Sequence, residues 1–285
     1  MNVLPSDTSC SLVCGSQAPA HVERLLATLA GMRIYLVDAS RDGRLRAPAL
    51  RAGAHYRHAP GDASHARGHN WALRAAAAAG SRHHAILDPG LEVAPAGLAR
   101  LFACLRRDPG IGLLAPRVRG PGGRLRPLCT LLPHPCGFLA RRVAPLLYRA
   151  SGCLARHELH GGYARPMDVP VPPLCCTLLR VEVALDAGLF DERLPAELAQ
   201  ADLARRVGRA ARVAYLPHVT VVHAGPRART GWRELPAALR YFDKWGWWRD
   251  EERARINARA LRACGVMPGR MGHAAGPPAR LGARG

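Results

Sequence analysis

The sequence alternates short apolar runs with segments of helical periodicity, and this alternation constrains the fold more than any other feature. The runs SCSLVCG (9–15), RIYLVDAS (33–40) and AIL (85–87) predict buried strands, because they are rich in aliphatic and β-branched residues. Between them, HVERLLATLA (21–30) and NWALRAAAAAG (70–80) have the spacing and composition of helices. Strands that alternate with helices of this length predict an α/β fold, with a mostly parallel sheet and helices on both faces.

The alternation continues to residue 118 and then becomes irregular. A strand is expected at AHYRHA (54–59), a helix at AGLARLFACLRR (96–107) and a further buried strand at GIGLLAPRV (110–118). Residues 119–166 are rich in Pro, Gly and Arg. We expect them to form an excursion from the sheet, with one helix around FLARRVAPLLYRA (138–150).

The strand and helix pattern returns in the C-terminal part of the chain. MDVPVPPLCCTLLRVEVALDAGLFDERL (167–194) predicts a strand and a helix, and a strand pair, RVAYLP and VTVVHAG, follows over residues 212–225. The helix expected at WRELPAALRYFDKWGWW (232–248) carries on one face the apolar residues Leu235, Leu239, Phe242 and Trp245. Its aromatic residues lie beside arginines, which is compatible with core packing or with an interfacial membrane helix.

These segments predict one domain over residues 1–248, with a C-terminal helical extension. From Arg249 the chain becomes charged, and it ends in AAGPPARLGARG (274–285). Such a composition cannot bury enough apolar surface to offset the entropy of ordering the chain. Residues 249–285 are therefore expected to form a disordered tail.

The composition points to anionic partners. The formal net charge is +20, and of the 41 basic residues all but Lys244 are arginine. A nucleic-acid-binding surface clusters its cations on one element, whereas these are dispersed along a chain rich in Ala, Gly and Pro. We therefore expect nucleoside diphosphates or an anionic membrane surface as partners, and no nucleic acid. The nine cysteines lie mostly inside apolar runs and are expected to be reduced core residues.

No segment has the composition of a targeting or membrane-spanning helix. The N-terminus lacks a charged region followed by an apolar one, and no window has about eighteen continuous apolar residues. We expect a cytoplasmic protein in which any membrane contact is peripheral, at the inner face of the plasma membrane. The helix expected at 232–248 is the candidate for that contact.

Two aspartates lie at the ends of predicted strands. Asp38 ends the strand in RIYLVDAS, and Asp88 follows AIL in HHAILDPGLEVAP (83–95). Ligands bind at the carboxyl ends of parallel strands, where a carboxylate can hold a metal ion beside a phosphate. Asp88 before Pro89 is alternatively a turn former, and both interpretations stay open.

Eight segments, taken in order, carry a resemblance to a known family. They are YLVDAS, ARGHNWALR, AILDPGLEVAPAGLARL, DPGIGLLAPRVRGPGGRLRPL, RPMDVPV, GLFDERL, ADLARR and VAYLPHVTVVHAG. Together they resemble family 2 glycosyltransferases, inverting enzymes of the Rossmann-like GT-A fold, and most of all the bacterial rhamnosyltransferase-type branch. The resemblance implies transfer of a hexosyl group from a nucleoside diphosphate sugar to a lipid-linked or polysaccharide acceptor, in the synthesis of cell-surface polysaccharide.

The resemblance also implies roles for individual positions. The implied nucleotide-binding residues are Asp38, Arg67, Gly68, Asn70 and Asp88. Asp88 and the residue at position 90 would hold Mg²⁺ or Mn²⁺, which neutralises the charge of the leaving diphosphate. The residue at position 200 would be the base that takes the proton of the acceptor hydroxyl.

Both of the last two positions depart from the family pattern. Gly90 stands where the family has a second carboxylate, and Gln200 stands where it has the base. A divalent ion held by Asp88 and His223 remains a candidate, weakened by Gly90, and Glu197 or Asp202 is the candidate replacement base. Simpler alternatives are a hydrogen-bonded structural role for His223 and an ion pair between Asp202 and the arginines that follow it.

Further departures affect the flanking loops. Ser64 and Ala66 replace glycines of the nucleotide loop, and Pro173-Leu174 replaces a Ser-Gly pair on the acceptor side. The losses concern the chemical step more than nucleotide binding. Two functions therefore stay open: a nucleotide-sugar-dependent glycosyltransferase, or a catalytically inactive pseudoenzyme that serves as a binding or scaffold partner.

Overall fold

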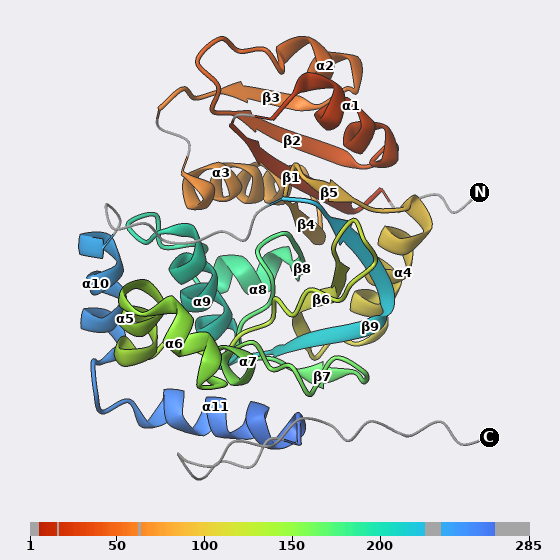
Figure 1. Cartoon of the computed structure of the whole chain (residues 1–285). Coiled ribbons are helices and arrows are strands. Elements are labelled where there is room, and N and C mark those ends of the chain that lie inside the picture. Colours follow the sequence, from red (N-terminus) through yellow and green to blue (C-terminus); the bar gives the residue numbers. More distant parts are fainter. Residues whose placement is uncertain (1–5, 16, 62–63, 226–234, 266–285) are drawn as a thin grey trace, which may run out of the picture.

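The computed structural model describes residues 6–15, 17–61, 64–225 and 235–265. Within these residues, a sheet of nine strands runs through the molecule in the order β3-β2-β1-β4-β8-β6-β9-β5, with β7 also paired to β9 (Figure 1). The strands are β1 Thr8–Cys14, β2 Arg33–Asp38, β3 His55–His58, β4 His83–Leu87, β5 Leu91–Glu92, β6 Ile111–Arg119, β7 Met167–Asp168, β8 Cys176–Arg180 and β9 Arg212–His223.

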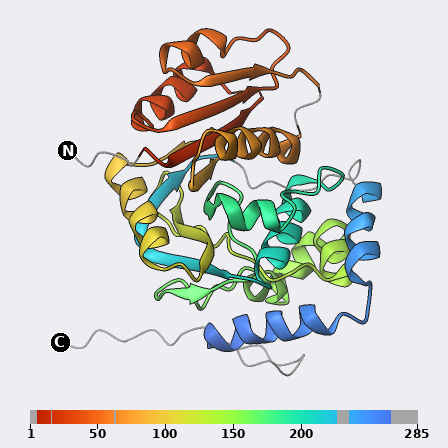
Figure 2. The ribbon, with the colours of Figure 1, turned by 180° about the vertical axis from the view of Figure 1, so that it is seen from behind.

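Helices cover both faces of this sheet. α1, α2 and α4 pack on one face, and α3, α8 and α9 pack on the other; Figure 2 shows α4 (yellow) from behind. The helices are α1 Pro19–Thr28, α2 Arg46–Arg51, α3 His65–Ala78, α4 Pro95–Arg107, α5 Pro135–Val143, α6 Pro145–Ala150, α7 Cys153–His157, α8 Val181–Asp186, α9 Ala196–Val207, α10 Leu235–Trp245 and α11 Glu251–Ala263. The α/β fold expected from the alternation is confirmed.

The sheet is mixed, and its two halves differ. In the N-terminal half, β3, β2, β1 and β4 are all parallel, as the strand–helix alternation predicts. β8 is inserted antiparallel between β4 and β6, and β6 is parallel to β9. The antiparallel insertion places the end of β4 beside the segment that precedes β8. Asp88 N there donates to Cys175 O at 2.9 Å.

Prolines explain two differences from the predicted elements. The expected strand pair over 212–225 is one strand, β9, whose pairing with β6 shifts from Pro116–Leu216 to Arg117–Thr220. A bulge around Pro217, which has no N–H to donate, absorbs the shift without ending the strand. The helix expected over 138–150 is two helices, because the residue before Pro145 leaves the helical conformation.

The helix that was expected to begin at Asn70 begins more than one turn earlier, at His65. The side-chain oxygen of Ser64 accepts a hydrogen bond from Arg67 N at 3.2 Å and caps the new first turn. Residues that were expected in a nucleotide-binding loop therefore lie in the first two turns of α3.

The C-terminal helical extension is present, but the expected disordered tail does not start at Arg249. α11 begins with Asp250 as its N-cap and buries Ala260 and Leu261 in the core. The guanidinium of Arg205 binds the Asp250 carboxylate at 2.6 Å and anchors the start of the helix. The buried apolar side chains and this ion pair stabilise α11, although the composition of residues 249–285 predicted no folded structure. Residues 266–285 lie outside the described part of the chain.

The aromatic helix α10 packs into the core. Tyr241 and Phe242 are buried, and the Arg205 guanidinium lies over the Trp245 ring at 4.1 Å from its centroid. Leu239, which was expected on the same apolar face as Phe242, is exposed. Of the two interpretations of this helix, the contacts match core packing.

The cysteines are free thiols, most of them buried, which agrees with reduced core residues. Among the described residues, no helix has both the length and the apolar character that crossing a membrane requires.

A buried polar network joins the central strands to α3. The Ser9 hydroxyl lies 2.7 Å from Nδ1 of His84, and Nε2 of His84 lies 2.7 Å from the Ser11 hydroxyl. Ser11 in turn lies 2.7 Å from Nδ1 of His69. Burial lowers the pKa of His84 to about 3 and holds the pKa of His69 well below its ordinary value, so both rings are neutral in the folded protein.

These histidines predict a loss of stability in mild acid. Because their pKa values are lower in the folded than in the unfolded chain, unfolding takes up protons once the pH falls below about 6.5. We expect the free energy of unfolding to fall by about 1.4 kcal/mol per pH unit for each such histidine, measured by urea unfolding between about pH 6.5 and pH 5.

The variant His84→Asn isolates one of these histidines. Because one histidine fewer takes up a proton on unfolding, the fall in the free energy of unfolding per pH unit should become smaller by about 1.4 kcal/mol. His218→Asn, at an exposed position of β9, is the control for replacing a histidine outside the buried network. An unchanged slope in His84→Asn would contradict this assignment.

Candidate functional site

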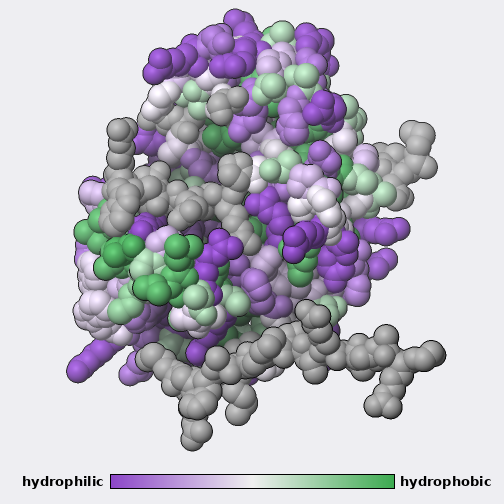
Figure 3. Space-filling view, viewed as in Figure 1, coloured by the Kyte–Doolittle hydropathy of each residue, from purple (hydrophilic) through white to green (hydrophobic). Residues whose placement is uncertain are grey.

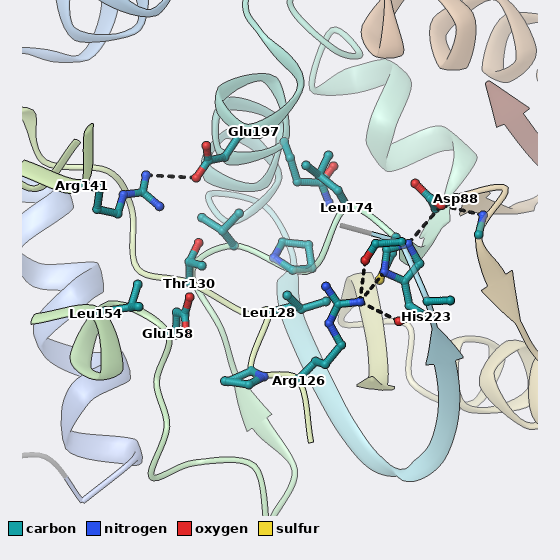
Figure 4. A pocket seen from close by; sticks show the side chains of 18 of the residues that line it. Asp88, Arg126, Leu128, Thr130, Arg141, Leu154, Glu158, Leu174, Glu197 and His223 are labelled. Atoms are coloured by element: carbon teal, nitrogen blue, oxygen red, sulfur yellow. Dashed lines mark hydrogen bonds and ion pairs between the residues drawn. The ribbon is translucent and has the colours of Figure 1, made fainter. Parts of the chain in front are cut away.

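A cavity of about 880 Å³ opens where β4 and β9 end, between the sheet, the first turn of α9 and the excursion that contains α5 to α7 (Figure 4). Its charged and polar lining consists of Gln17, His21, Asp88, Arg126, Thr130, Arg141, Arg142, Tyr148, Arg149, Glu158, Glu197, Gln200 and His223. The cavity therefore lies at the sheet edge where Asp88 was expected to bind a ligand.

Asp88 and His223 meet at one end of this cavity. Oδ1 of Asp88 accepts hydrogen bonds from Gly90 N at 2.7 Å and from Nε2 of His223 at 3.0 Å. Burial raises the pKa of Asp88, but the hydrogen bonds from His223 and the Gly90 amide outweigh it and hold that pKa below its ordinary value. Asp88 is therefore an ionised carboxylate, and the turn-forming and cavity-lining interpretations of it are compatible.

Arg126 fixes the other side of the His223 ring. Nη1 of Arg126 lies 3.1 Å from Nδ1 of His223, and it donates to the backbone oxygens of His223 at 2.6 Å and Gly225 at 2.8 Å. A guanidinium can only donate hydrogen bonds, so Nδ1 of His223 must accept. The proton of the neutral ring is then on Nε2, which points at Asp88.

This arrangement does not fit a divalent metal held by Asp88 and His223. A histidine ligand needs a free nitrogen lone pair, but Nδ1 of His223 accepts from Arg126 and Nε2 carries the proton. No group of three or more His, Cys, Asp or Glu side chains in the described ranges is placed to hold a metal ion. A Cβ atom added at Gly90 would lie 3.0 Å from Oδ1 of Asp88, so a second carboxylate there would crowd the first.

The first turn of α9 supplies the opposite wall. Glu197 forms an ion pair with Arg141 at 3.0 Å, and both residues line the cavity. Gln200 is only 2% exposed, and its Nε2 donates to the Thr177 hydroxyl at 3.2 Å. Its Oε1 has no hydrogen-bond partner among the described residues. Glu197 is therefore the carboxylate of α9 that faces the cavity.

Asp202, the other candidate base, lies elsewhere. Its carboxylate is fully buried, accepts from Trp245 Nε1 at 2.7 Å, and binds Lys244 at 2.7 Å and Arg206 at 2.6 Å. It does not line the cavity. The structure thus uses Asp202 to join α9 to α10, which matches the ion-pair alternative.

The other residues expected to bind nucleotide are also engaged within the protein. The two carboxylate oxygens of Asp38 accept from Ser40 N at 2.9 Å and from Leu45 N at 3.1 Å. Asn70 bonds both the N–H and the C=O of Phe190, each at 2.9 Å. Neither residue lines the cavity of Asp88.

Arg67 and Gly68 line a second, smaller pocket of about 400 Å³ beside α3. Arg67 also lies 3.7 Å from Glu192 in an ion pair. The structure therefore joins Asp88, His223 and Glu197 in one cavity, and it places the expected nucleotide-loop residues outside that cavity.

Sequence reasoning missed the cavity residues of the excursion, Arg126, Arg141, Tyr148 and Glu158. No periodicity marks residues 119–166, and a single arginine has little signal in a chain with 41 basic residues. The nearest signal was the segment GRLRPL (123–128), which contains Arg126 and is part of the family resemblance.

Known proteins resemble this chain in structure rather than in sequence. No family model matches this chain, and no curated protein matches it. A crystal structure of GalNAc-T7 with UDP, GalNAc and Mn²⁺ has a TM-score of 0.60 at 14% identity, over 94% of this chain and 52% of its own. A crystal structure of S. aureus TarS 1–349 has a TM-score of 0.55 at 14% identity, over 90% of this chain and 71% of its own.

This chain has the GT-A fold. TarS 1–349 in complex with UDP-GlcNAc gives the same TM-score, 0.55, at 15% identity over 90% of this chain and 72% of its own. The chain spans about half the length of the GalNAc-T7 chain that it matches. At these identities the comparison establishes the fold, and the fold class expected from the sequence is confirmed.

The buried position of Asp202 predicts a structural effect. Asp202→Asn leaves Lys244 and Arg206 with an uncharged partner, and we expect a loss of about 3 kcal/mol in the free energy of unfolding. Urea unfolding at neutral pH measures the loss. The control Asp186→Asn, at an exposed position of α8, should change it by less than about 0.5 kcal/mol. A loss in Asp202→Asn as small as that of the control would contradict the structural role.

Proposed function

We propose that this chain is an inverting glycosyltransferase that moves a sugar from a nucleoside diphosphate to an acceptor hydroxyl. The observation that carries the proposal is the cavity at the carboxyl edge of the GT-A sheet, with Asp88 and Arg126 on one side and Glu197 on another (Figure 4). UDP and UDP-GlcNAc in the GalNAc-T7 and TarS structures support a nucleotide-sugar donor. The motif resemblance supports a hexosyl donor of the dTDP-rhamnose type.

In such a transfer, the acceptor oxygen attacks the anomeric carbon while the bond from that carbon to the diphosphate oxygen breaks. The proton of the acceptor hydroxyl must pass to a base on the side of attack. Glu197 lines the cavity, and Arg141 orients its carboxylate, whereas the amide at Gln200 cannot accept that proton. Glu197 is therefore our candidate base, in preference to Asp202.

The first test is transfer by the purified protein from a panel of nucleoside diphosphate sugars. Glu197→Gln should lower the transfer rate by about 10²- to 10⁴-fold and leave nucleotide affinity unchanged, because a base acts on the acceptor side. Glu182→Gln, at an exposed position of α8, is the matched control. Full activity in Glu197→Gln would refute the base assignment, and absence of binding to every nucleoside diphosphate would refute the function.

A second candidate function is a catalytically inactive binding or scaffold partner of an active transferase. The observation that favours it is the pair of departures at Gly90 and Gln200, which removes the expected metal ligand and the expected base. Measurable transfer or donor hydrolysis that Asp88→Ala abolishes would reject this alternative. Nucleotide binding without any turnover would favour it.

The surface of α6, beside the cavity, has the properties of a membrane contact. Leu146 and Leu147 of α6 are 80% and 72% exposed, and Figure 3 shows a hydrophobic patch over the face that carries α5 and α6. Residues 134–157 contain no Asp or Glu, and Arg149 of α6 lines the cavity. These features support a lipid-linked acceptor at an anionic surface, such as the inner face of the plasma membrane, in the synthesis of surface polysaccharide.

We expect the α6 surface to bind anionic vesicles. The double variant Leu146→Ser with Leu147→Ser should weaken binding to vesicles that contain phosphatidylglycerol by at least about tenfold, because two leucine side chains leave the bilayer boundary. Leu50→Ser, at an exposed position of α2, is the control. Co-sedimentation measures the affinity, and equal binding of both variants would argue against this surface.

A further inference from the structure

We propose that this chain binds the diphosphate of its donor without a divalent cation, through the guanidinium of Arg126. The inference rests on the proposed function and names the group that replaces the metal. By the family resemblance Asp88 would hold a metal ion, whereas the hydrogen bonds around Asp88 and His223 leave the histidine no free lone pair for one.

The position of Arg126 is fixed by its backbone and by its side chain. Arg126 N donates to Val118 O at 2.9 Å, and Arg119 forms an antiparallel bridge with Leu125, so the chain after β6 folds back on the strand as a short hairpin that ends at Arg126. Nη1 binds the end of β9 through the backbone oxygens of His223 and Gly225 and the ring of His223. The guanidinium is thus held beside Asp88 without reaching its carboxylate.

Part of the guanidinium remains available to a ligand. An arginine side chain has five N–H donors, and the three contacts found for Arg126 in the described ranges all use the two hydrogens of Nη1. Nε and Nη2 keep three donors in the planar fork that matches two phosphate oxygens. Arg126 lines the cavity and is half-buried, so solvent screens its charge less than that of a surface arginine.

The same geometry explains how a phosphate can approach Asp88. Oδ1 of Asp88 already accepts from His223 and from the Gly90 amide, so part of its charge is neutralised within the protein. A guanidinium is permanently charged at all relevant pH values and is more weakly hydrated than an ammonium group. It can therefore neutralise charge that develops on the leaving diphosphate, which is the task that a metal ion performs in metal-dependent sites.

Calorimetric titration of the wild-type protein gives the first test. UDP, dTDP and GDP are titrated in EDTA and again in Mg²⁺ or Mn²⁺, and the nucleoside diphosphate that binds is compared with its nucleoside. We expect the diphosphate to bind equally well, within about twofold, in EDTA and in metal. Binding that requires a metal ion would overturn the proposal, and this arm needs no variant.

Variants at position 126 give the second test. Arg126→Gln should weaken the affinity for the nucleoside diphosphate by about 10- to 100-fold and leave the affinity for the nucleoside unchanged, because the charge-assisted hydrogen bonds to phosphate are lost and a nucleoside has no phosphate. Arg124→Gln removes an exposed arginine from the same hairpin and should bind like wild type. Unchanged diphosphate affinity in Arg126→Gln would overturn the proposal.

The two levels of failure are distinguishable. If neither nucleosides nor nucleoside diphosphates bind under any condition, the glycosyltransferase function itself fails. If they bind but depend on metal, or do not depend on Arg126, only the metal-free site fails. Retained nucleoside affinity in Arg126→Gln also shows that the variant is folded.

Discussion

The pairing of β9 with its neighbours determines where the candidate site forms. β9 lies along β6 and pairs with β7 near its start and with β5 near its end, where His223 is opposite Leu91. Ala224 N then donates to Gly90 O at 3.3 Å, which ties the chain after β9 to the turn after β4. Because these backbone bonds fix both segments, the Asp88 carboxylate, the His223 ring and the carbonyls that hold Arg126 meet at one point.

The sequence predicted the parts of the fold whose signals are local. Apolar runs and helical spacing located β1, β2, β4, α1 and α3, and the positions of Asp88 and His223 at strand ends followed from the apolar runs. The short helix α2, between β2 and β3, was not predicted. The association of Asp88 with His223 came from the family resemblance, since 135 residues separate them and only sheet pairing brings them together. Prolines caused two of the errors: Pro217 is accommodated by a bulge, whereas Pro145 ends a helix.

The candidate site was less predictable, because the role of a polar residue depends on its tertiary partners. Asp202 follows the family pattern in sequence, yet Lys244 and Trp245, more than forty residues away, occupy its carboxylate. Arg126, by contrast, was not predicted but lines the cavity. Nothing local distinguishes it from the many other arginines, and its position becomes informative only when β9 is paired.

The two departures from the family pattern are each consistent with their surroundings. At position 90, a Cβ would lie 3.0 Å from Oδ1 of Asp88, so a side chain there would require the carboxylate that binds His223 to shift. At position 200, the amide donates to Thr177, whose own hydroxyl proton goes to Pro173 O at 2.7 Å. A carboxylate there would place an acceptor against an oxygen with no proton to give. Gly90 and Gln200 therefore belong to the hydrogen-bond arrangement of this chain. In the proposed mechanism, the Arg126 cation takes the place of the metal ion, and the Glu197 carboxylate takes the place of the base expected at position 200.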